Sequence, residues 1–295
     1  MTSPVRVHSA LFAVAFLFSA NYIISKVAMR EISPMAFAWL RVVGAAILLW
    51  TFARGEPVSR EDARRVVLYG ILGVAVNQTM FLTGLSFTTV QVAAILITSI
   101  PVFTLAVAIA TKRETPTATR IGGIALACAG ALLVVGGEGL HGTARSALGA
   151  VLILINCLSY ATYLVISKQH MSRLSAQSVV SRMFVSGAII LLPFAAPSLV
   201  RQDWRAVSPS AWISLALVIL GPTVAAYMLQ AWSLAYAESS MVATYTYVQP
   251  VLATLLAWLW FGEAVRPIVA VAAAMIFAGV WLAGRNAGGS PARKM

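Results

Sequence analysis

Ten apolar stretches, each about long enough to cross a bilayer, follow one another along the 295-residue chain. Only 10% of the residues are charged and 60% are hydrophobic, which leaves no plausible watery surface. Ten spans of about 20 residues take roughly 200 positions, so no separate soluble domain fits. We therefore expect an all-α integral membrane protein with ten transmembrane helices, near residues 8–28, 33–53, 65–84, 88–110, 118–137, 146–168, 176–199, 208–234, 239–261 and 266–284.

The basic residues indicate how these helices are oriented. If the N-terminus is cytoplasmic, the inner loops and tails carry 13 Lys and Arg, and the outer loops carry 6. Because Lys and Arg hold loops on the cytoplasmic side, both termini are expected there. The same rule accounts for the net charge of +12, and no basic run is interleaved with aromatics as a nucleic-acid surface would be. Nucleic-acid binding is not expected.

The two halves of the chain resemble each other. Ile24-Ser25-Lys26 recurs as Ile166-Ser167-Lys168, and from the third helix onward the offset is 149, which pairs Pro101 with Pro250 and Gly130 with Gly279. The pattern predicts one repeat over residues 1–137, a second over 146–284 and a cytoplasmic tail over 285–295. Because five spans is an odd number, the second repeat is expected to lie upside down in the membrane. Inverted repeats favour a transporter whose midplane site opens alternately to each side.

Two segments carry a family resemblance. Residues 93–114, AAILITSIPVFTLAVAIATKRE, and 242–263, VATYTYVQPVLATLLAWLWFGE, share small residues, a proline within the helix and a Glu at its exit. With five-plus-five spans, they resemble the paired EamA domains of the drug/metabolite transporter superfamily. The first segment departs from the family's usual Gly before Glu, since Arg113 precedes Glu114. The resemblance implies a bacterial inner-membrane carrier, usually an exporter of amino acids or small metabolites, and the many Tyr and Trp are similar to aromatic amino-acid exporters.

Polar side chains inside spans are costly against lipid, so they are expected to face the bundle. Residues 156, 160, 163 and 167 share one helix face, and the repeat offset carries much of this stripe onto the first helix. The expected substrate-binding residues are Asn21, Asn77, Gln78, Phe81, Thr98, Tyr160, Tyr163, Tyr227, Gln230, Tyr245 and Gln249. The alternative is that the amides serve as hydrogen bonds between helices and the aromatics as interfacial belts.

Prolines and arginines inside spans allow two interpretations each. Pro101 and Pro250 interrupt the hydrogen-bond ladder of their helices and are predicted hinges, with kinks that only improve packing as the alternative. Arg41 and Arg182 lie within reach of a span end or of neighbouring carbonyls, so a structural role through snorkelling or through bonds to those carbonyls is favoured. Pairing with a substrate carboxylate is the alternative.

Chemistry that the chain lacks narrows the function. All nine acids and three histidines fall in loops or at span ends, so no embedded carboxylate is available for proton-coupled efflux of cationic drugs. Intramembrane enzyme signatures are also missing, and Cys128 and Cys157 read as buried apolar residues. We expect no enzyme, no cofactor and no metal site. Downhill transport of a small-molecule substrate is expected, in a chain compatible with a monomer, and an exchanger of phosphorylated metabolites or a drug carrier is the alternative.

Overall fold

The computed structural model describes residues 4–52, 59–141, 143–171, 175–237, 242, 245–262 and 267–284. These residues form helices and the turns between them, with no strand. The helices are α1 Pro4–Ala28, α2 Pro34–Phe52, α3 Arg60–Gly70, the π-helical η1 Ile71–Val76, α4 Asn77–Phe87, α5 Val90–Ile97, α6 Ile100–Ala110, α7 Ala118–His141, α8 Ala144–Met171, α9 Ala176–Arg201, α10 Pro209–Val218, the π-helical η2 Ile219–Ala225, α11 Ala226–Tyr236, the short η3 Tyr245–Tyr247, α13 Val248–Phe261 and α14 Pro267–Gly284.

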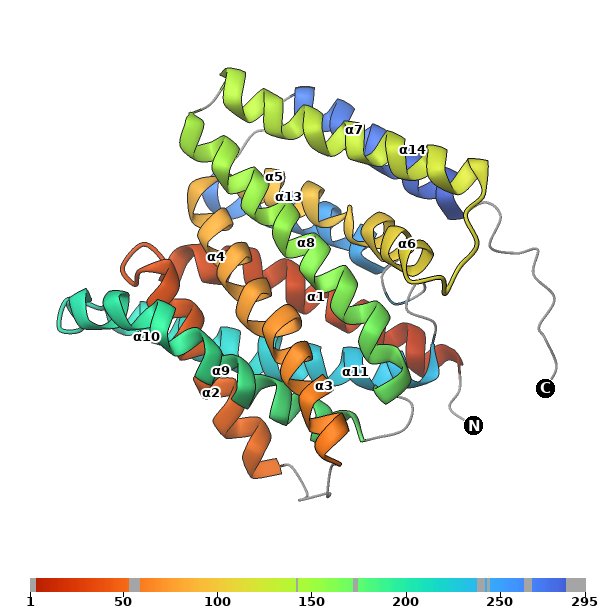
Figure 1. Cartoon of the computed structure of the whole chain (residues 1–295). Helices are drawn as coiled ribbons and strands as arrows, with labels where there is room; N and C mark the ends of the chain where they lie inside the picture. The colour runs from red at the N-terminus through yellow and green to blue at the C-terminus, as the bar shows by residue number, and fades with distance from the viewer. Residues whose placement is uncertain are drawn as a thin grey trace.

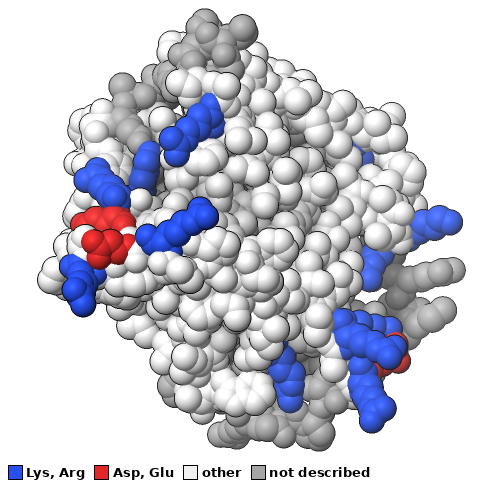
Figure 2. Space-filling view, turned by 60° about the vertical axis from the view of Figure 1, so that its left-hand side comes forward, with Lys and Arg blue, Asp and Glu red and all other residues white. Residues whose placement is uncertain are grey.

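Eight helical segments in the described part of the chain are long and apolar enough to cross a membrane: 5–28, 34–51, 60–87, 90–110, 118–136, 144–168, 177–201 and 209–236. The shorter apolar helices α13 and α14 lie where the sequence predicts the last two spans. Large apolar side chains such as Phe16, Ile189 and Trp260 are exposed on the outside of the bundle. Figure 2 shows most Lys and Arg toward two opposite sides of one face, with a broad uncharged surface between. The chain is a helical multi-pass membrane protein.

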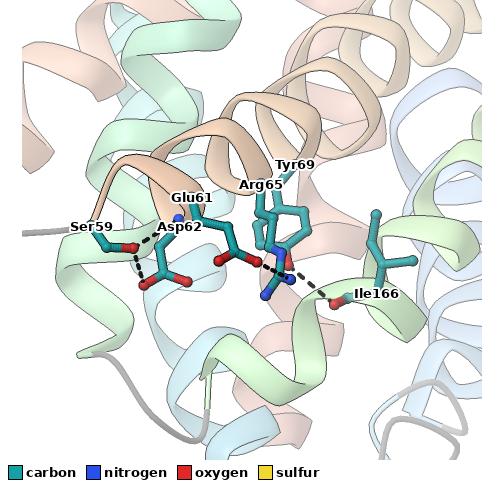
Figure 3. A network of polar contacts seen from close by, with 6 residues as sticks. All are labelled: Ser59, Glu61, Asp62, Arg65, Tyr69 and Ile166. Atoms are coloured by element: carbon teal, nitrogen blue, oxygen red, sulfur yellow. Dashed lines mark hydrogen bonds and ion pairs between the residues drawn. The ribbon is translucent and has the colours of Figure 1, made fainter.

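The beginning of α3 illustrates how a polar sequence sets a helix start. Ser59 caps α3, because its Oγ accepts a hydrogen bond from the backbone N–H of Asp62 at 3.1 Å and donates to the Asp62 carboxylate at 2.8 Å (Figure 3). One turn further, Arg65 and Glu61 form an exposed ion pair of 2.6 Å. Tyr69 then donates its hydroxyl to the carbonyl of Ile166 at 3.1 Å, which ties α3 to the last part of α8.

Two structural features of the first half recur in the second half. The π-helical segments η1 and η2 interrupt equivalent helices, directly before α4 and α11. At the ends of those helices, Lys26 donates to the carbonyl of Thr88 at 3.2 Å, and Lys168 donates to the carbonyl of Ala237 at 2.7 Å. Thr88 and Ala237 are the C-cap residues of α4 and α11, where the helix carbonyls attract a cation. Figure 1 shows α1 and α8 running in opposite senses, so the two lysines lie toward opposite ends of the bundle.

The helices α7 and α14 lie side by side at one edge of the bundle (Figure 1). Two glycines permit this approach. A Cβ on Gly130 would lie 2.9 Å from the carbonyl oxygen of Ala272, and a Cβ on Gly279 would lie 2.6 Å from that of Gly123. Gly130 and Gly279 are separated by the offset of 149, and so are Gly123 and Ala272. Each helix therefore presents the same positions to the other.

Candidate functional site

A cavity lies between residues of the two halves, deep in the bundle. Side chains from α1, α2, α4, α8, α11 and α13 and from the α5–α6 region contribute to its wall, so both halves must pack together to form it. About 60 Å³ of it is water-accessible, room for a few water molecules. The lining residues are Phe18, Asn21, Tyr22, Arg41, Asn77, Gln78, Phe81, Ile97, Ile100, Asn156, Tyr160, Tyr227, Thr246 and Gln249.

A directed chain of hydrogen bonds joins the halves at this cavity. The Tyr227 hydroxyl donates to the carbonyl of Gly73 at 3.1 Å, and Gln78 Nε2 donates to the Tyr227 hydroxyl at 3.0 Å. Because a backbone carbonyl can only accept, this chain fixes which end of the Gln78 amide is the donor. Gln78 and Tyr227 are also equivalent at the repeat offset of 149 and contact each other directly.

On α8, the NH₂ group of a side-chain amide is again committed to a hydrogen-bond acceptor. Asn156 Nδ2 donates to the backbone carbonyl of Asn77 at 3.0 Å. One turn along α8, the hydroxyl of Tyr160 donates to Gln230 Oε1, and the Tyr160 ring lies edge-on to the Tyr227 ring with centroids 6.4 Å apart. The Asn156 amide and the Tyr160 phenol are therefore held in place by hydrogen-bond and ring partners on α4 and α11.

The opposite wall comes from α1 and α13. Tyr22 donates its hydroxyl to Gln249 Oε1 at 3.3 Å, and its ring lies edge-on to Phe81 with centroids 5.4 Å apart. Such edge-to-face pairs are favourable and fix the ring orientation. The cavity thus has amide and hydroxyl groups set among aromatic rings, the composition expected of a small-molecule site.

Arg41, in the middle of α2, is the basic residue of this wall. Its side chain is 1% exposed, and its Nε donates to Thr223 Oγ1 at 2.6 Å. No described acidic side chain forms an ion pair with it. The snorkelling interpretation of Arg41 is therefore wrong, because the guanidinium is buried beside the cavity instead of reaching a membrane surface.

Three polar atoms of the cavity-lining residues are buried without a hydrogen-bond partner: Arg41 Nη1, Gln78 Oε1 and Asn156 Oδ1. One is a donor on a cation, and two are amide oxygens that accept. Leaving such groups unpaired in a buried site costs free energy. A solute that carries an anionic and a cationic group would supply partners to both kinds.

Seven of the eleven sequence-predicted binding residues line the cavity: Asn21, Asn77, Gln78, Phe81, Tyr160, Tyr227 and Gln249. The other four lie outside its wall. Thr98 donates to the carbonyl of Ile95 in its own turn at 2.5 Å, and Tyr245 contacts His8. Gln230 accepts the Tyr160 hydroxyl, and Tyr163 packs its ring on Tyr160 with centroids 5.5 Å apart. Gln230 and Tyr163 therefore support the wall from behind.

Both predicted hinge prolines lie in the first turn of a helix and not in its middle. The α5 helix ends at Ile97, Thr98 and Ser99 form a turn, and Pro101 is at the start of α6. In the second half, Pro250 lies in the first turn of α13, directly after η3. A proline in a first turn leaves no helix hydrogen bond unmade, because its N–H would be unpaired there anyway.

The sequence prediction of binding residues did not include Phe18, Tyr22, Ile97, Ile100, Asn156 and Thr246. Asn156 belongs to the stripe of residues 156, 160, 163 and 167, and Phe18 is the counterpart of Tyr160 at the offset of 142, so the sequence carries a signal for both. No sequence signal marks Tyr22 or Thr246. Each is next to a predicted residue, and only the packing of the helices determines which of two neighbours faces the cavity. Among the described residues, no three His, Cys, Asp or Glu side chains gather as a metal site would require.

The two halves both match one family model. The model of the EamA-like transporter family matches residues 6–136 and again residues 147–285. The chain belongs to the EamA-like transporter family. The members are transporters and not enzymes, so a small-molecule substrate and a surrounding lipid bilayer follow for this chain.

Several curated relatives are similar to this chain along most of their length. A transporter from Archaeoglobus fulgidus is 25% identical over 94% of this chain and 96% of its own. The Escherichia coli inner membrane transporter YedA is 26% identical over 88% and 84%, and a probable terminal-alkyne amino-acid exporter from Streptantibioticus cattleyicolor is 28% identical over 83% and 82%. A solved crystal structure with 17% identity superposes with a TM-score of 0.68 over 98% of this chain and 100% of the other, which indicates a common fold.

Proposed function

We propose that this protein exports amino acids, preferentially aromatic or bulky apolar ones, or similar small metabolites. The observation that carries this proposal is the cavity between the halves, in which amide and hydroxyl groups are set in an aromatic wall. Amides and hydroxyls suit the charged groups of an amino acid, and rings such as Phe81 and Tyr160 suit an apolar side chain. The amino-acid exporter of Streptantibioticus cattleyicolor supports this substrate class.

The proposed architecture is ten spans in two inverted repeats, over 1–137 and 146–284. The double match of the family model supports two repeats. The α7–α14 contact supports a pseudo-twofold relation, because in such an interface each partner contacts the same positions of the other. Gln78 and Tyr227 are equivalent residues in direct contact, which supports a position for both close to the axis of this pseudo-twofold relation. In an inverted repeat the axis lies in the membrane plane, so the cavity would be at the midplane.

The proposed location is the bacterial inner membrane, with both termini and the tail 285–295 in the cytoplasm. The excess of basic residues on the inner side of the proposed topology supports this orientation. The described ends of the chain, at the start of α1 and the end of α14, lie on the same side of the bundle (Figure 1). The relative YedA is called an inner membrane transporter.

The proposed mechanism is alternating access without ion coupling. The water-accessible space of about 60 Å³ is too small for an aromatic amino acid, so the walls must separate before one can enter. A short turn precedes α6, and the three-residue η3 precedes α13, which suits a hinge role for Pro101 and Pro250. No acid or histidine lies in mid-span to carry a proton, so the solute gradient is the proposed driving force.

Transport by the pure protein tests this proposal. Proteoliposomes that contain only this chain should exchange labelled phenylalanine, tryptophan or leucine faster than threonine, and faster than protein-free liposomes. Collapsing the proton gradient at a fixed amino-acid gradient should leave the flux unchanged. Absence of flux for every amino acid would overturn the substrate class, and a flux that stops with the proton gradient would overturn the uncoupled mechanism.

A further inference from the structure

The buried charge of Arg41 requires an explanation. A charged side chain in mid-membrane is costly unless a partner or water compensates it. Arg41 is 1% exposed, and the described acids give it no ion pair. Its described partner is the hydroxyl of Thr223, which is neutral. The protein therefore holds a cation whose charge is not neutralised by a described residue.

The structure holds this cation in a defined orientation. Pro222 has no N–H to offer the carbonyl of Val218, four residues earlier, and the Thr223 hydroxyl donates to that carbonyl at 2.7 Å. The Thr223 oxygen can then accept from Arg41 Nε, at 2.6 Å. A guanidinium is planar, so fixing Nε also limits where the two Nη groups lie. Nη1 is left buried and without a partner in a residue that lines the cavity.

We propose that Arg41 binds the carboxylate of the transported solute, and that the free oxygens of Gln78 and Asn156 receive its ammonium group. This inference rests on the proposed function and adds what the solute must carry. Both amide oxygens are acceptors because their NH₂ groups are committed, to Tyr227 and to the carbonyl of Asn77. The residues that line the cavity thus hold one buried cationic donor and two buried neutral acceptors without partners, the complement of a zwitterion.

A carboxylate fits this wall better than a phosphate. A phosphate monoester carries about −1.5 to −2 charge, and Arg41 is the sole basic residue among those that line the cavity. A carboxylate carries one negative charge, which one guanidinium balances. A cationic amine without a carboxylate would meet the Arg41 charge without compensation and should be rejected.

Paired solutes test the carboxylate requirement in the wild-type protein. Proteoliposomes take up labelled L-phenylalanine, or the best-transported amino acid of the panel above, while unlabelled competitors are added. We expect the amino-acid amide, which keeps the ring and the ammonium but lacks the carboxylate, to compete at least tenfold less well than the amino acid. Phenyl phosphate should not compete. Equal competition by the amide would overturn the inference while the flux itself leaves the proposed function standing, whereas absence of any amino-acid flux would overturn both.

Variants test whether Arg41 is the residue responsible. Arg41→Gln should raise the KM for the amino acid more than tenfold and remove the preference over the amide. Arg41→Lys keeps the charge but not the planar fork of the guanidinium, so its KM should lie between the KM of wild type and that of Arg41→Gln. Arg182→Gln, at the equivalent position of the second half, is the matched control, and its KM should stay within about twofold of the wild-type KM. Unchanged KM and unchanged preference in Arg41→Gln would overturn the assignment, as would competition by phenyl phosphate that depends on Arg41. If Arg41→Gln fails to fold, the amide comparison in the wild type still decides.

Discussion

Arg41 and Arg182 occupy equivalent positions in the two halves but have different surroundings. Arg41 is buried, contacts Thr223 of the other half and lines the cavity. Arg182 is partly exposed, and its Nη1 bonds to Ser178 on its own helix, to the carbonyl at 3.2 Å and to the hydroxyl. Arg41 therefore belongs to the site, whereas Arg182 bonds to a residue of its own helix, α9.

Neighbouring residues explain this difference. Four residues before Arg182 stands Ser178, which offers oxygens to the guanidinium, whereas the residue four before Arg41 is the buried Phe37. Across the interface, the counterpart of Thr223 in the first half is Val74, which has no hydroxyl. The comparison shows that the two halves share the arrangement of their helices. A few residues that differ between the halves give the two arginines different partners.

The helix packing that the two halves share can be disrupted at the contact between α7 and α14. Gly279→Ala places a Cβ 2.6 Å from backbone atoms of Gly123 and Ala127, and Gly130→Ala places one 2.9 Å from the carbonyl of Ala272. Because backbone cannot yield as a side chain can, both variants should lower the yield of monodisperse protein severely. Gly136→Ala is the control, since nothing lies within 4 Å of its Cβ. Size-exclusion chromatography and melting in detergent measure the effect. Normal yields of both glycine variants would contradict the pseudo-twofold packing.

The roles of Arg41 and Arg182 in transport and in stability can be distinguished by replacing each arginine with methionine. Arg41→Met should reduce amino-acid flux more than tenfold but leave the substrate-free melting temperature unchanged or raised, because removing an uncompensated buried charge is often neutral or stabilising. Arg182→Met should keep its flux and lose a few degrees, since it gives up contacts within α9. Melting curves in detergent and liposome flux measure both. A loss of stability in Arg41→Met larger than that of Arg182→Met would indicate that Arg41 is structural.

Removing the oxygen partner of each arginine should give a smaller effect. Thr223→Val keeps the shape of residue 223 but takes away the acceptor of Arg41 Nε. We expect a severalfold rise in KM with little change in the maximal rate, because the guanidinium loses its orientation and keeps its charge. Thr223→Ser should retain transport, and Ser178→Ala should leave it unchanged. Identical kinetics for Thr223→Val and wild type would show that Thr223 does not position Arg41.

The smallest effect is expected outside the membrane, where the halves meet at a loop. Ser208 donates its backbone N–H and its hydroxyl to the carboxylate of Glu31, at 2.6 and 2.8 Å, and these bonds lower the pKa of Glu31. A lowered pKa stabilises the folded protein above the unfolded pKa, about 4.3, and this stability is lost as the pH falls through the folded value.

The melting temperature of Glu31→Gln should therefore be slightly below that of wild type at neutral pH, and the two should converge as the solution is acidified below about pH 4. Glu61→Gln, which removes an exposed ion pair, is the control and should differ little from wild type at any pH. A constant difference between Glu31→Gln and wild type over the whole pH range would exclude a role for the carboxylate charge.

The apolar stretches were sufficient to predict an all-helical membrane protein, because burying backbone polar groups in lipid permits little else. The site was predicted in part. The stripe of Asn156 and Tyr160 follows from helical periodicity, but the sequence could not tell that the Thr98 hydroxyl would bond to its own turn. It also favoured a structural role for Arg41, through snorkelling or neighbouring carbonyls, because the acceptor Thr223 is 182 residues away in the sequence. Pairings of this kind depend on packing between helices and leave no local pattern.

The two lysine contacts at the helix ends have a consequence for the balance between conformations. Lys26 and Lys168 bind C-terminal carbonyls of equivalent helices toward opposite ends of the bundle, and both contacts are formed in this structure. If the protein opens at one end by releasing such a contact, opening at the other end releases a contact of the same chemistry. The two open states should then differ little in free energy. A modest difference in binding affinity between them would be enough to shift the population, so the solute itself can determine which end opens.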